Sequence, residues 1–287
     1  MRIVPAVMCS AGFAILTAAP HAQPQPAREP SLALDTRPLL AQRTPILDVA
    51  IAPDGARLIV LEPDQVSLRR VDAAGDASDV VEQRAVQTAR IWPRDLRGRI
   101  DASHVPFDVF LPGVTCRGGL DPLRISCADE TAPWPGLANS GVEAARNYFT
   151  TPEGRPFSSA APLPAGAQAR WLVADRQGGL LFFDDKRSPV GRPATAGDDV
   201  AAAYAACSAG PFVVVSNRVA RDAAGAADPA DVDELRLFRV AGRELVSSAT
   251  PLRLPGILTA LWDAVAIVHD VATDRYEAFR ISVSCAR

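Results

Sequence analysis

The chain has 287 residues, 48% of them hydrophobic and 22% charged, and its 30 basic and 33 acidic residues give a net charge of −3 at pH 7. This mildly acidic balance, with both signs interspersed, lacks the basic patch of nucleic-acid-binding proteins, so nucleic acid is not an expected partner. No apolar run reaches the roughly 18 residues of a membrane-spanning helix, and the length suits one large domain.

The first 22 residues are predicted to be a secretory signal peptide. One charge, Arg2, precedes an apolar stretch at 11–16, which leads into small residues. Cleavage after Ala22 is preferred over cleavage after Ala19. Residues 23–31 are rich in proline and predict an exposed linker, so 32–287 would form the folded domain. A periplasmic or secreted location follows from the signal peptide.

Short strand-like segments divided by turn residues fill the rest of the chain. The first set is separated by Pro53-Asp54-Gly55, Pro63-Asp64 and Gly75, and comprises 46–51, 58–61, 66–71 and 80–86. Further segments follow at 98–102, 107–111, 123–127, 171–174, 180–183, 200–207, 212–215, 235–240 and 244–249. The last set is 257–262, 264–269 and 276–283. No stretch sustains a helical period over three turns, so the chain is predicted to be all-β. The alanine-rich segment 200–206 is the nearest helix candidate, and it could equally be a tightly packed inner strand.

The two ends of the predicted domain resemble each other. Both Pro45 and Pro255 are followed by an Ile-Leu segment, then by an apolar strand and then by an alternating one. Repeats of about 40 to 45 residues would give roughly six blades of a β-propeller, and insertions at 131–164 and 221–232 could reduce this to five. We therefore expect a single propeller of about five to seven antiparallel blades. The final unit has three clear strands, and 32–40 is well placed to complete it and to close the ring. A two-sheet sandwich is the main alternative.

One motif supports the propeller by resemblance. The segment from Ala52 to Leu61, Ala-Pro-Asp-Gly followed by an apolar strand, resembles the WD40-like propeller repeats of exported bacterial proteins. The match covers about ten residues and implies the fold only. Physically it is a tight turn, in which proline sets φ, aspartate bonds to the backbone and glycine supplies a positive φ.

Cysteine spacing predicts two disulfide bonds. Without Cys9 in the signal peptide, four of the five cysteines remain, an even count that suits an oxidising compartment. Three pairings are possible. A turn-rich stretch between Cys116 and Cys127 favours a hairpin that joins these two, which leaves Cys207 to pair with Cys285. A four-cysteine zinc site would need pairs spaced by two to four residues, and no such spacing is present.

The sequence contains few residues suited to catalysis. The hydrolase elbow, the phosphate loop, the dinucleotide fingerprint and the His-Glu-x-x-His motif are all absent, and no cofactor is expected. Beyond the signal peptide only His104 and His269 remain, which excludes a centre of three histidines within the chain. His269 is interpreted as a strand-end residue bonded to backbone or to Asp270. The acidic run 228–234 could offer oxygen ligands to calcium, but its spacing differs from an EF-hand, so we interpret it as a solvated loop.

Two tryptophans mark candidate binding residues on the rim. Trp92 lies among four arginines at 90–99, and the arginines of interest are Arg94 and Arg97. Guanidinium groups suit carboxylates or phosphates, and an indole ring gives a face for stacking. Trp134 is flanked by prolines in the longest insertion. The alternative interpretation is structural, with Asp95 holding one arginine and Trp92 packed between blades.

These observations favour an exported, non-catalytic propeller that binds an unidentified protein or glycan. The alternative is a propeller-fold hydrolase or lyase that uses carboxylates and arginines at the central channel. Acids converging in the channel from several blades would favour the enzyme, and a closed apolar channel would favour the binding protein. The sequence leans toward the binding protein.

Overall fold

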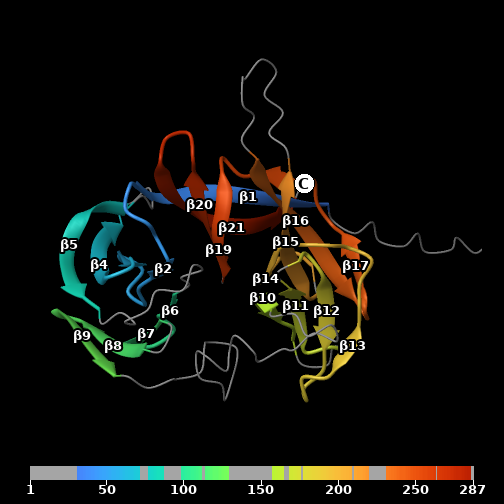
Figure 1. Cartoon of the computed structure of the whole chain (residues 1–287), viewed down its shortest axis with the longest axis horizontal. Helices are drawn as coiled ribbons and strands as arrows, with labels where there is room; N and C mark the ends of the chain where they lie inside the picture. Colours follow the sequence, from blue (N-terminus) through green and yellow to red (C-terminus); the bar gives the residue numbers. More distant parts are fainter. Residues whose placement is uncertain are drawn as a thin grey trace, which may run out of the picture.

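The computed structural model describes residues 31–71, 77–86, 98–111, 114–128, 157–164, 168–175, 177–208, 210–219, 231–262 and 264–285. Within these residues the chain forms five antiparallel sheets, four of four strands and one of five, set around a common centre (Figure 1). The prediction of an all-β propeller of about five to seven blades is therefore confirmed, and the sandwich alternative is wrong.

The blades follow one another along the chain. The first contains β2 (Asp48–Ile51), β3 (Arg57–Leu61), β4 (Gln65–Val71) and β5 (Ala77–Ala85). The second contains β6 (Arg99–Asp101), β7 (Phe107–Leu111), β8 (Val114–Leu120) and β9 (Leu123–Ala128). The third contains β10 (Phe157–Pro162), β11 (Trp171–Asp175), β12 (Leu180–Phe183) and β13 (Pro189–Gly191). The fourth contains β14 (Asp199–Ala203), β15 (Phe212–Val219), β16 (Val232–Ala241) and β17 (Glu244–Ser247), with β18 (Leu252–Arg253) paired to β16.

The fifth blade joins the two ends of the domain. Its strands β19 (Ile257–Trp262), β20 (Val265–Asp270) and β21 (Arg275–Cys285) come last in the chain, and the outermost strand is β1 (Leu32–Gln42). The β1–β21 pairing runs from Leu32 opposite Cys285 to Gln42 opposite Tyr276. The amino-terminal strand thus completes the last blade, as the sequence predicts, and covers an edge that would otherwise be open.

Apolar side chains fill the junctions between neighbouring blades. The described residues form four such clusters, which join the first blade to the second, the third to the fourth, the fourth to the fifth and the fifth to the first. Phe107, Phe182 and Leu235 are fully buried in three of them. At these four junctions each blade buries one face against its neighbour, so the core is shared between blades rather than confined within each one.

Several strands differ from the sequence prediction. Within the turn-rich stretch between Cys116 and Cys127 the hairpin turns at Asp121-Pro122, as expected, but the glycine pair Gly118-Gly119 lies inside β8 rather than in the turn. A Cβ at Gly118 would overlap the ring of Phe107, so only glycine fits there. Strand β10 lies in the stretch 131–164, which the sequence predicts to be an insertion. Its Ser-Ser-Ala-Ala sequence carries little β-propensity, so the pattern does not indicate a strand there. The alanine-rich segment that resembled a helix begins with strand β14.

The Pro-Asp-Gly turn has the predicted geometry and a further role. Gly55 has a φ of 68°, and the carboxylate of Asp54 accepts a hydrogen bond of 2.9 Å from the N–H of Ala56. Asp54 also binds Arg57, whose guanidinium reaches the second blade and donates to Asp121 at 2.6 Å and 3.1 Å. The turn motif therefore ties the first blade to the second.

Candidate functional site

A pocket of about 630 Å³ lies at the centre of the ring. All five blades contribute to its lining through the carboxyl-terminal ends of their first strands, β2, β6, β10, β14 and β19. These ends supply Ile51, Asp101, Pro162, Ala202 and Trp262. The first strands are thus the inner strands of the propeller, and β2 and β19 occupy equivalent positions, as predicted from the resemblance between the two ends of the chain.

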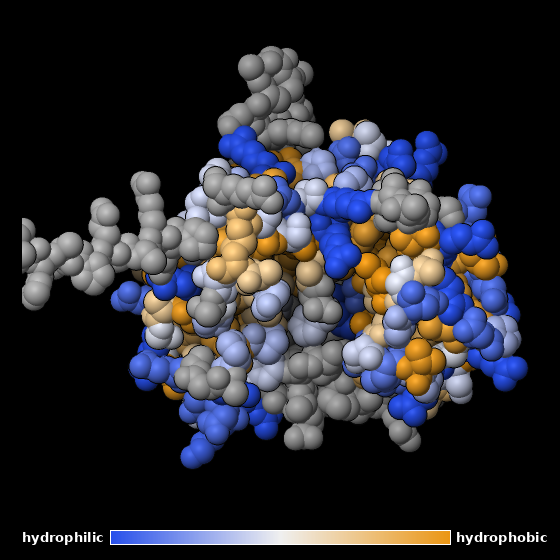
Figure 2. Space-filling view, turned by 180° about the vertical axis from the view of Figure 1, so that it is seen from behind, coloured by the Kyte–Doolittle hydropathy of each residue, from blue (hydrophilic) through white to orange (hydrophobic). Residues whose placement is uncertain are grey.

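Most of the pocket wall is apolar. Aliphatic side chains of the first, second and fifth blades provide it, among them Val49, Leu58, Ile100 and Val265. The polar lining residues are Asp48, Asp101, Ser103 and Arg280. A mainly apolar wall with a few polar groups is typical of ligand-binding pockets, and the volume falls within the range of about 300 to 1,000 Å³ found for them. In Figure 2, which views the ring from its other side, hydrophilic residues lie around the outer edge, and a further hydrophilic group lies near the middle beside hydrophobic residues.

Both acids of the pocket hold backbone groups. Asp48 is 3% exposed, and its carboxylate accepts hydrogen bonds from the N–H of Val49 at 2.9 Å and of Ile100 at 2.8 Å. Since Ile100 belongs to the second blade, this acid fixes β6 beside β2. Asp101 accepts from the N–H and the hydroxyl of Ser103 at 3.0 Å and 2.6 Å. The channel is therefore neither a funnel of free acids nor a closed apolar tube.

An arginine from the second blade reaches the tryptophan of the fifth. The guanidinium carbon of Arg99, a buried residue, lies 5.2 Å from the centre of the Trp262 ring. Such cation–π contacts contribute about 0.5 to 2 kcal/mol. Because β6 and β19 belong to blades that are not neighbours in the ring, the contact bridges the channel across the first blade.

Three exposed apolar side chains lie on the face of the ring where the inner strands end. Tyr204, directly after β14, is 82% exposed, and Val105, in the turn after β6, is 57% exposed. Ile51 at the end of β2 is 36% exposed and also lines the pocket. These residues come from three blades, yet all follow or end an inner strand. They therefore lie on the same face of the ring as the pocket mouth.

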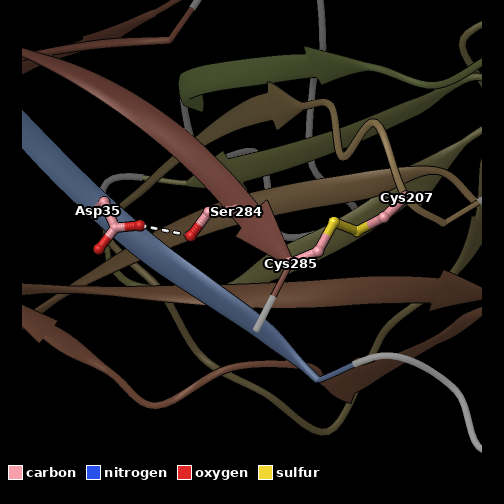
Figure 3. The surroundings of a disulfide bond; sticks show 4 residues. All are labelled: Asp35, Cys207, Ser284 and Cys285. Atoms are coloured by element: carbon pink, nitrogen blue, oxygen red, sulfur yellow. Dashed lines mark hydrogen bonds between the residues drawn. A yellow bond between two sulfur atoms is a disulfide. The ribbon is translucent and has the colours of Figure 1, made fainter. Parts of the chain in front are cut away.

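A disulfide bond secures this face. Cys207, in the segment after β14, is bonded to Cys285 at the end of β21, and their Cα atoms are 6.2 Å apart. Nearby, the hydroxyl of Ser284 donates to the carboxylate of Asp35 on β1 at 2.6 Å (Figure 3). Ala205 also forms a bridge with Val283. The fourth blade is thus fastened covalently to the strand pair that closes the ring.

The second disulfide lies within one blade. Cys116 on β8 and Cys127 on β9 face each other directly, with their Cα atoms 3.9 Å apart. The structure therefore contains the two cysteine pairs that the sequence favours.

The predicted rim residues lie outside the described part of the chain. Trp92, Arg94 and Arg97 belong to the undescribed stretch 87–97, and Trp134 belongs to 129–156. Their described neighbours, at the end of each outer strand and the start of the next inner strand, lie on the face opposite the pocket mouth.

The two histidines have structural partners. His269 stacks on Tyr276 with ring centres 4.4 Å apart, and its Nε2 lies 3.1 Å from Asp274. The expected carboxylate partner, Asp270, instead binds the hydroxyl of Thr273 at 2.8 Å, so that detail of the prediction is wrong. His104 is 2.6 Å from the carbonyl oxygen of Pro106 through Nδ1.

The described part of the acidic run stabilises a blade junction. Asp233 is 2% exposed, and its carboxylate accepts from Arg218 at 3.1 Å and 3.2 Å and from the N–H of Leu258 at 2.6 Å. The hydrogen bond with Asp233 raises the pKa of Arg218 despite partial burial. The described residues contain no group of three or more side chains arranged to hold a metal ion.

Sequence reasoning missed the residues that define the pocket. Trp262 ends an apolar segment without a recognisable binding motif, and Arg280 is one of two arginines on β21. On the face around the pocket, Tyr204, a lone aromatic in an alanine-rich stretch, carries a local signal. The others become neighbours only when the ring closes.

No known family and no curated protein matches the chain. Among solved structures, the chain is similar to BBS1N in a complex with ARL6DN, at 10% identity over 82% of this chain and 77% of that chain, with a TM-score of 0.41. It is similar to the WD40 domain of SCAP from fission yeast, at 9% identity over 83% and 84% of the two chains, with a TM-score of 0.33. It is also similar to BamB from Moraxella catarrhalis, at 11% identity over 81% and 71%, with a TM-score of 0.26. The propeller assignment rests on the strand order of this chain, and these likenesses carry no conclusion about its function.

Within the described residues, no helix has the length and apolar character that crossing a bilayer requires.

Proposed function

We propose that this chain is an exported, non-catalytic propeller that binds a partner protein on the face where its inner strands end. The observation that carries the proposal is the set of exposed apolar side chains on that face. Tyr204, Val105 and Ile51 come from three blades and lie on the face where the inner strands end, and Ile51 also lines the pocket. Exposed tyrosines are enriched at protein interfaces, because they bury a large area at a small entropic cost. A rigid ring that carries such residues on its turns suits binding.

The chemistry of the pocket supports binding over the hydrolase or lyase alternative. General acid–base catalysis needs a carboxyl group that is free to exchange a proton with a substrate. Asp48 is buried beneath two backbone N–H groups of neighbouring blades, and Asp101 is bonded within its own turn. Both acids therefore serve to position the inner strands.

Export is part of the same proposal. Two disulfide bonds suit an oxidising compartment such as the periplasm or the exterior, in line with the signal peptide expected at 1–22. Amino-terminal sequencing of the protein recovered from its native host should find a start near Gln23. Retention of Met1 on a cytoplasmic protein would contradict export.

The binding surface can be tested with the mature chain immobilised and exposed to a native extracytoplasmic extract. A specific partner should be captured by the wild type and lost with Tyr204→Ser or Val105→Ser. Val246→Ser is the matched control, since Val246 is 41% exposed on β17, the outer strand of the blade that carries Tyr204. Equal capture by Tyr204→Ser and Val246→Ser would show that the pocket face is not the interface.

The rim residues remain a separate candidate surface for a protein or glycan. Combined substitution of Trp92 and Arg94 by alanine should weaken partner capture and leave the melting temperature nearly unchanged if these residues bind. A sharp fall in melting temperature would assign them a structural role.

A further inference from the structure

The junction between the fifth and first blades carries three arginines without an acidic partner among the described residues. Arg280 on β21 lines the pocket where it extends between these blades, together with Leu39, Leu58 and Val265. Arg37 on β1 is directly opposite Arg280 in the β1–β21 pairing. On the facing wall of the first blade, Arg69 lies directly opposite Leu58 in the β3–β4 pairing.

Arg37 and Arg280 form a like-charge pair. Directly paired residues in antiparallel strands have their Cβ atoms about 5 Å apart on the same face, and like charges at such positions repel each other. Both side chains are exposed, and neither forms an ion pair with a described residue. Asp35 lies on the same side of β1, two residues earlier, but its carboxylate is bonded to Ser284 (Figure 3). A bound anion would relieve the repulsion.

Only part of the hydrogen-bonding capacity of the Arg69 guanidinium is used. One of its terminal nitrogens donates to the side-chain oxygen of Gln42 at 2.7 Å, whereas its Nε is buried and has no hydrogen-bond partner. Gln42 in turn donates to Glu62 at 2.7 Å, so the nearby carboxylate contacts the neutral amide rather than the guanidinium. A buried guanidinium nitrogen without an acceptor is unfavourable, so Arg69 adds positive charge to the first-blade side of the junction without an acid to neutralise it.

The rest of the pocket suits the apolar part of a ligand. From Arg280 the lining continues through Leu39, Leu58 and Val265 to Trp262 near the axis. The two acids of the pocket belong to β2 and β6, on blades other than the one that supplies Arg280 and Arg37. The pocket therefore has a cationic end at the junction, whereas toward the centre its aliphatic wall and Trp262 lie beside two acids that are bonded to backbone groups.

We propose that this pocket binds a small organic carboxylate with an apolar body, whose carboxylate contacts Arg280 with Arg37 beside it. A guanidinium group pairs with a carboxylate through two parallel hydrogen bonds, which gives both affinity and orientation. This site is independent of the docking of a partner protein, because it uses the interior of the pocket and the blade junction rather than Tyr204 and Val105.

The test compares acids with neutral amides of the same shape. Binding of octanoate and 3-phenylpropionate, and of octanamide and 3-phenylpropionamide, is measured by isothermal titration calorimetry at low ionic strength. At least one acid should bind the wild type at least tenfold more tightly than its amide. Arg280→Gln should abolish this preference, and Trp262→Ala should weaken the acid and the amide alike. Arg124→Gln is the control, since Arg124 is an exposed arginine on the outer strand β9.

Folding of the variants is followed by thermal melting. Arg280→Gln should melt no lower than the wild type, because it removes a like-charge pair. If Arg280→Gln does not fold, Arg37→Gln takes its place, and its preference for the acid over the amide should be smaller than that of the wild type. Equal affinity for acids and amides, absence of binding by both acids, or an unchanged preference in Arg280→Gln would overturn the proposal. If Tyr204→Ser loses partner capture but still binds the carboxylate, the partner surface and the carboxylate site are independent of each other.

Discussion

Single residues at the blade junctions decide how closely neighbouring strands approach. Gly118 and Gly119 are adjacent on β8, yet a Cβ at Gly118 would overlap the ring of Phe107, whereas one at Gly119 would meet nothing within 4 Å. Both glycines have ordinary strand conformations, so the difference between them is packing alone. The structure thus predicts opposite outcomes for two neighbouring substitutions.

Gly118→Ala should destabilise the protein by about 1 to 3 kcal/mol, the usual cost of overpacking a core, because the fully buried Phe107 ring cannot move aside. Gly119→Ala should be neutral or slightly stabilising, since alanine restricts the unfolded chain. Urea denaturation of both variants measures the difference. Equal stability of the two would contradict the packing argument.

The cluster of Asp54, Arg57 and Asp121 should make the free energy of unfolding depend on pH in the acidic range. Hydrogen bonds from Arg57 lower the pKa of Asp121. For Asp54, burial opposes the change, but hydrogen bonds from Ala56 and Arg57 prevail and lower the pKa as well. A carboxyl group whose pKa is lower in the folded state stabilises it above the unfolded pKa, near 4, and loses that contribution as pH falls through the folded pKa. The contribution is therefore full at pH 6 and is lost below about pH 4.

Asp121→Asn should flatten this acid dependence. Between pH 6 and pH 3 the melting temperature of the wild type should fall more steeply than that of the variant, since the variant has one such carboxylate fewer. Asp79→Asn, at an exposed position on β5, is the control and should retain the wild-type slope. A variant of Asp121 with the full wild-type slope would show that the ion pair does not contribute in solution.

At the scale of elements, the two disulfide bonds constrain very different lengths of chain. Cys116 and Cys127 are 11 residues apart on one hairpin, whereas Cys207 and Cys285 are 78 apart and join the fourth blade to the fifth. In the chain-entropy model, the shorter loop contributes about 3 kcal/mol and the longer one about 4 to 5 kcal/mol. The longer bond also holds the strand pair that closes the ring.

Replacing Cys207 and Cys285 by serine should therefore lower the melting temperature more than replacing Cys116 and Cys127. Thermal melting of the two double variants under oxidising conditions gives the comparison. Peptide mapping without reductant should first confirm the two pairings in the wild type. A larger loss from the Cys116–Cys127 pair would contradict the entropic ranking.

For the whole molecule, closure of the ring depends on β1. This strand pairs with β21 along its length, and its apolar side chains enter two blade junctions, with Leu34 toward the fourth blade and Leu39 and Leu40 toward the first. It thus provides backbone pairing and core packing at once. Without it, the edge of β21 and parts of both junctions would be exposed to solvent.

A chain that begins at Thr44 should fail to fold cooperatively or should aggregate, whereas one that begins at Ser31 should match the mature protein. Circular dichroism and size-exclusion chromatography distinguish these results. A synthetic peptide of residues 31–43 added to the shorter chain should restore part of the native signal. Cooperative unfolding of the shorter chain at the wild-type temperature would show that the ring does not need β1.

The sequence alone determines most strands, because alternation and turn residues act locally. β7 and β12 begin and end where the pattern predicts, the Pro-Asp-Gly turn forms as its residues require, and cysteine spacing favours the pairs found. The closing role of β1 also follows, from a last unit that lacks one strand. Strands without a clear apolar alternation escape notice, as β10 shows with its small residues.

The pocket is decided by tertiary structure alone. Arg280 and Arg37 lie far apart in the sequence and meet only when β1 pairs with β21, and no local pattern marks Trp262 as the partner of Arg99. Their proximity depends on how the blades twist and pack around the axis, and that depends on side chains from the whole chain at once.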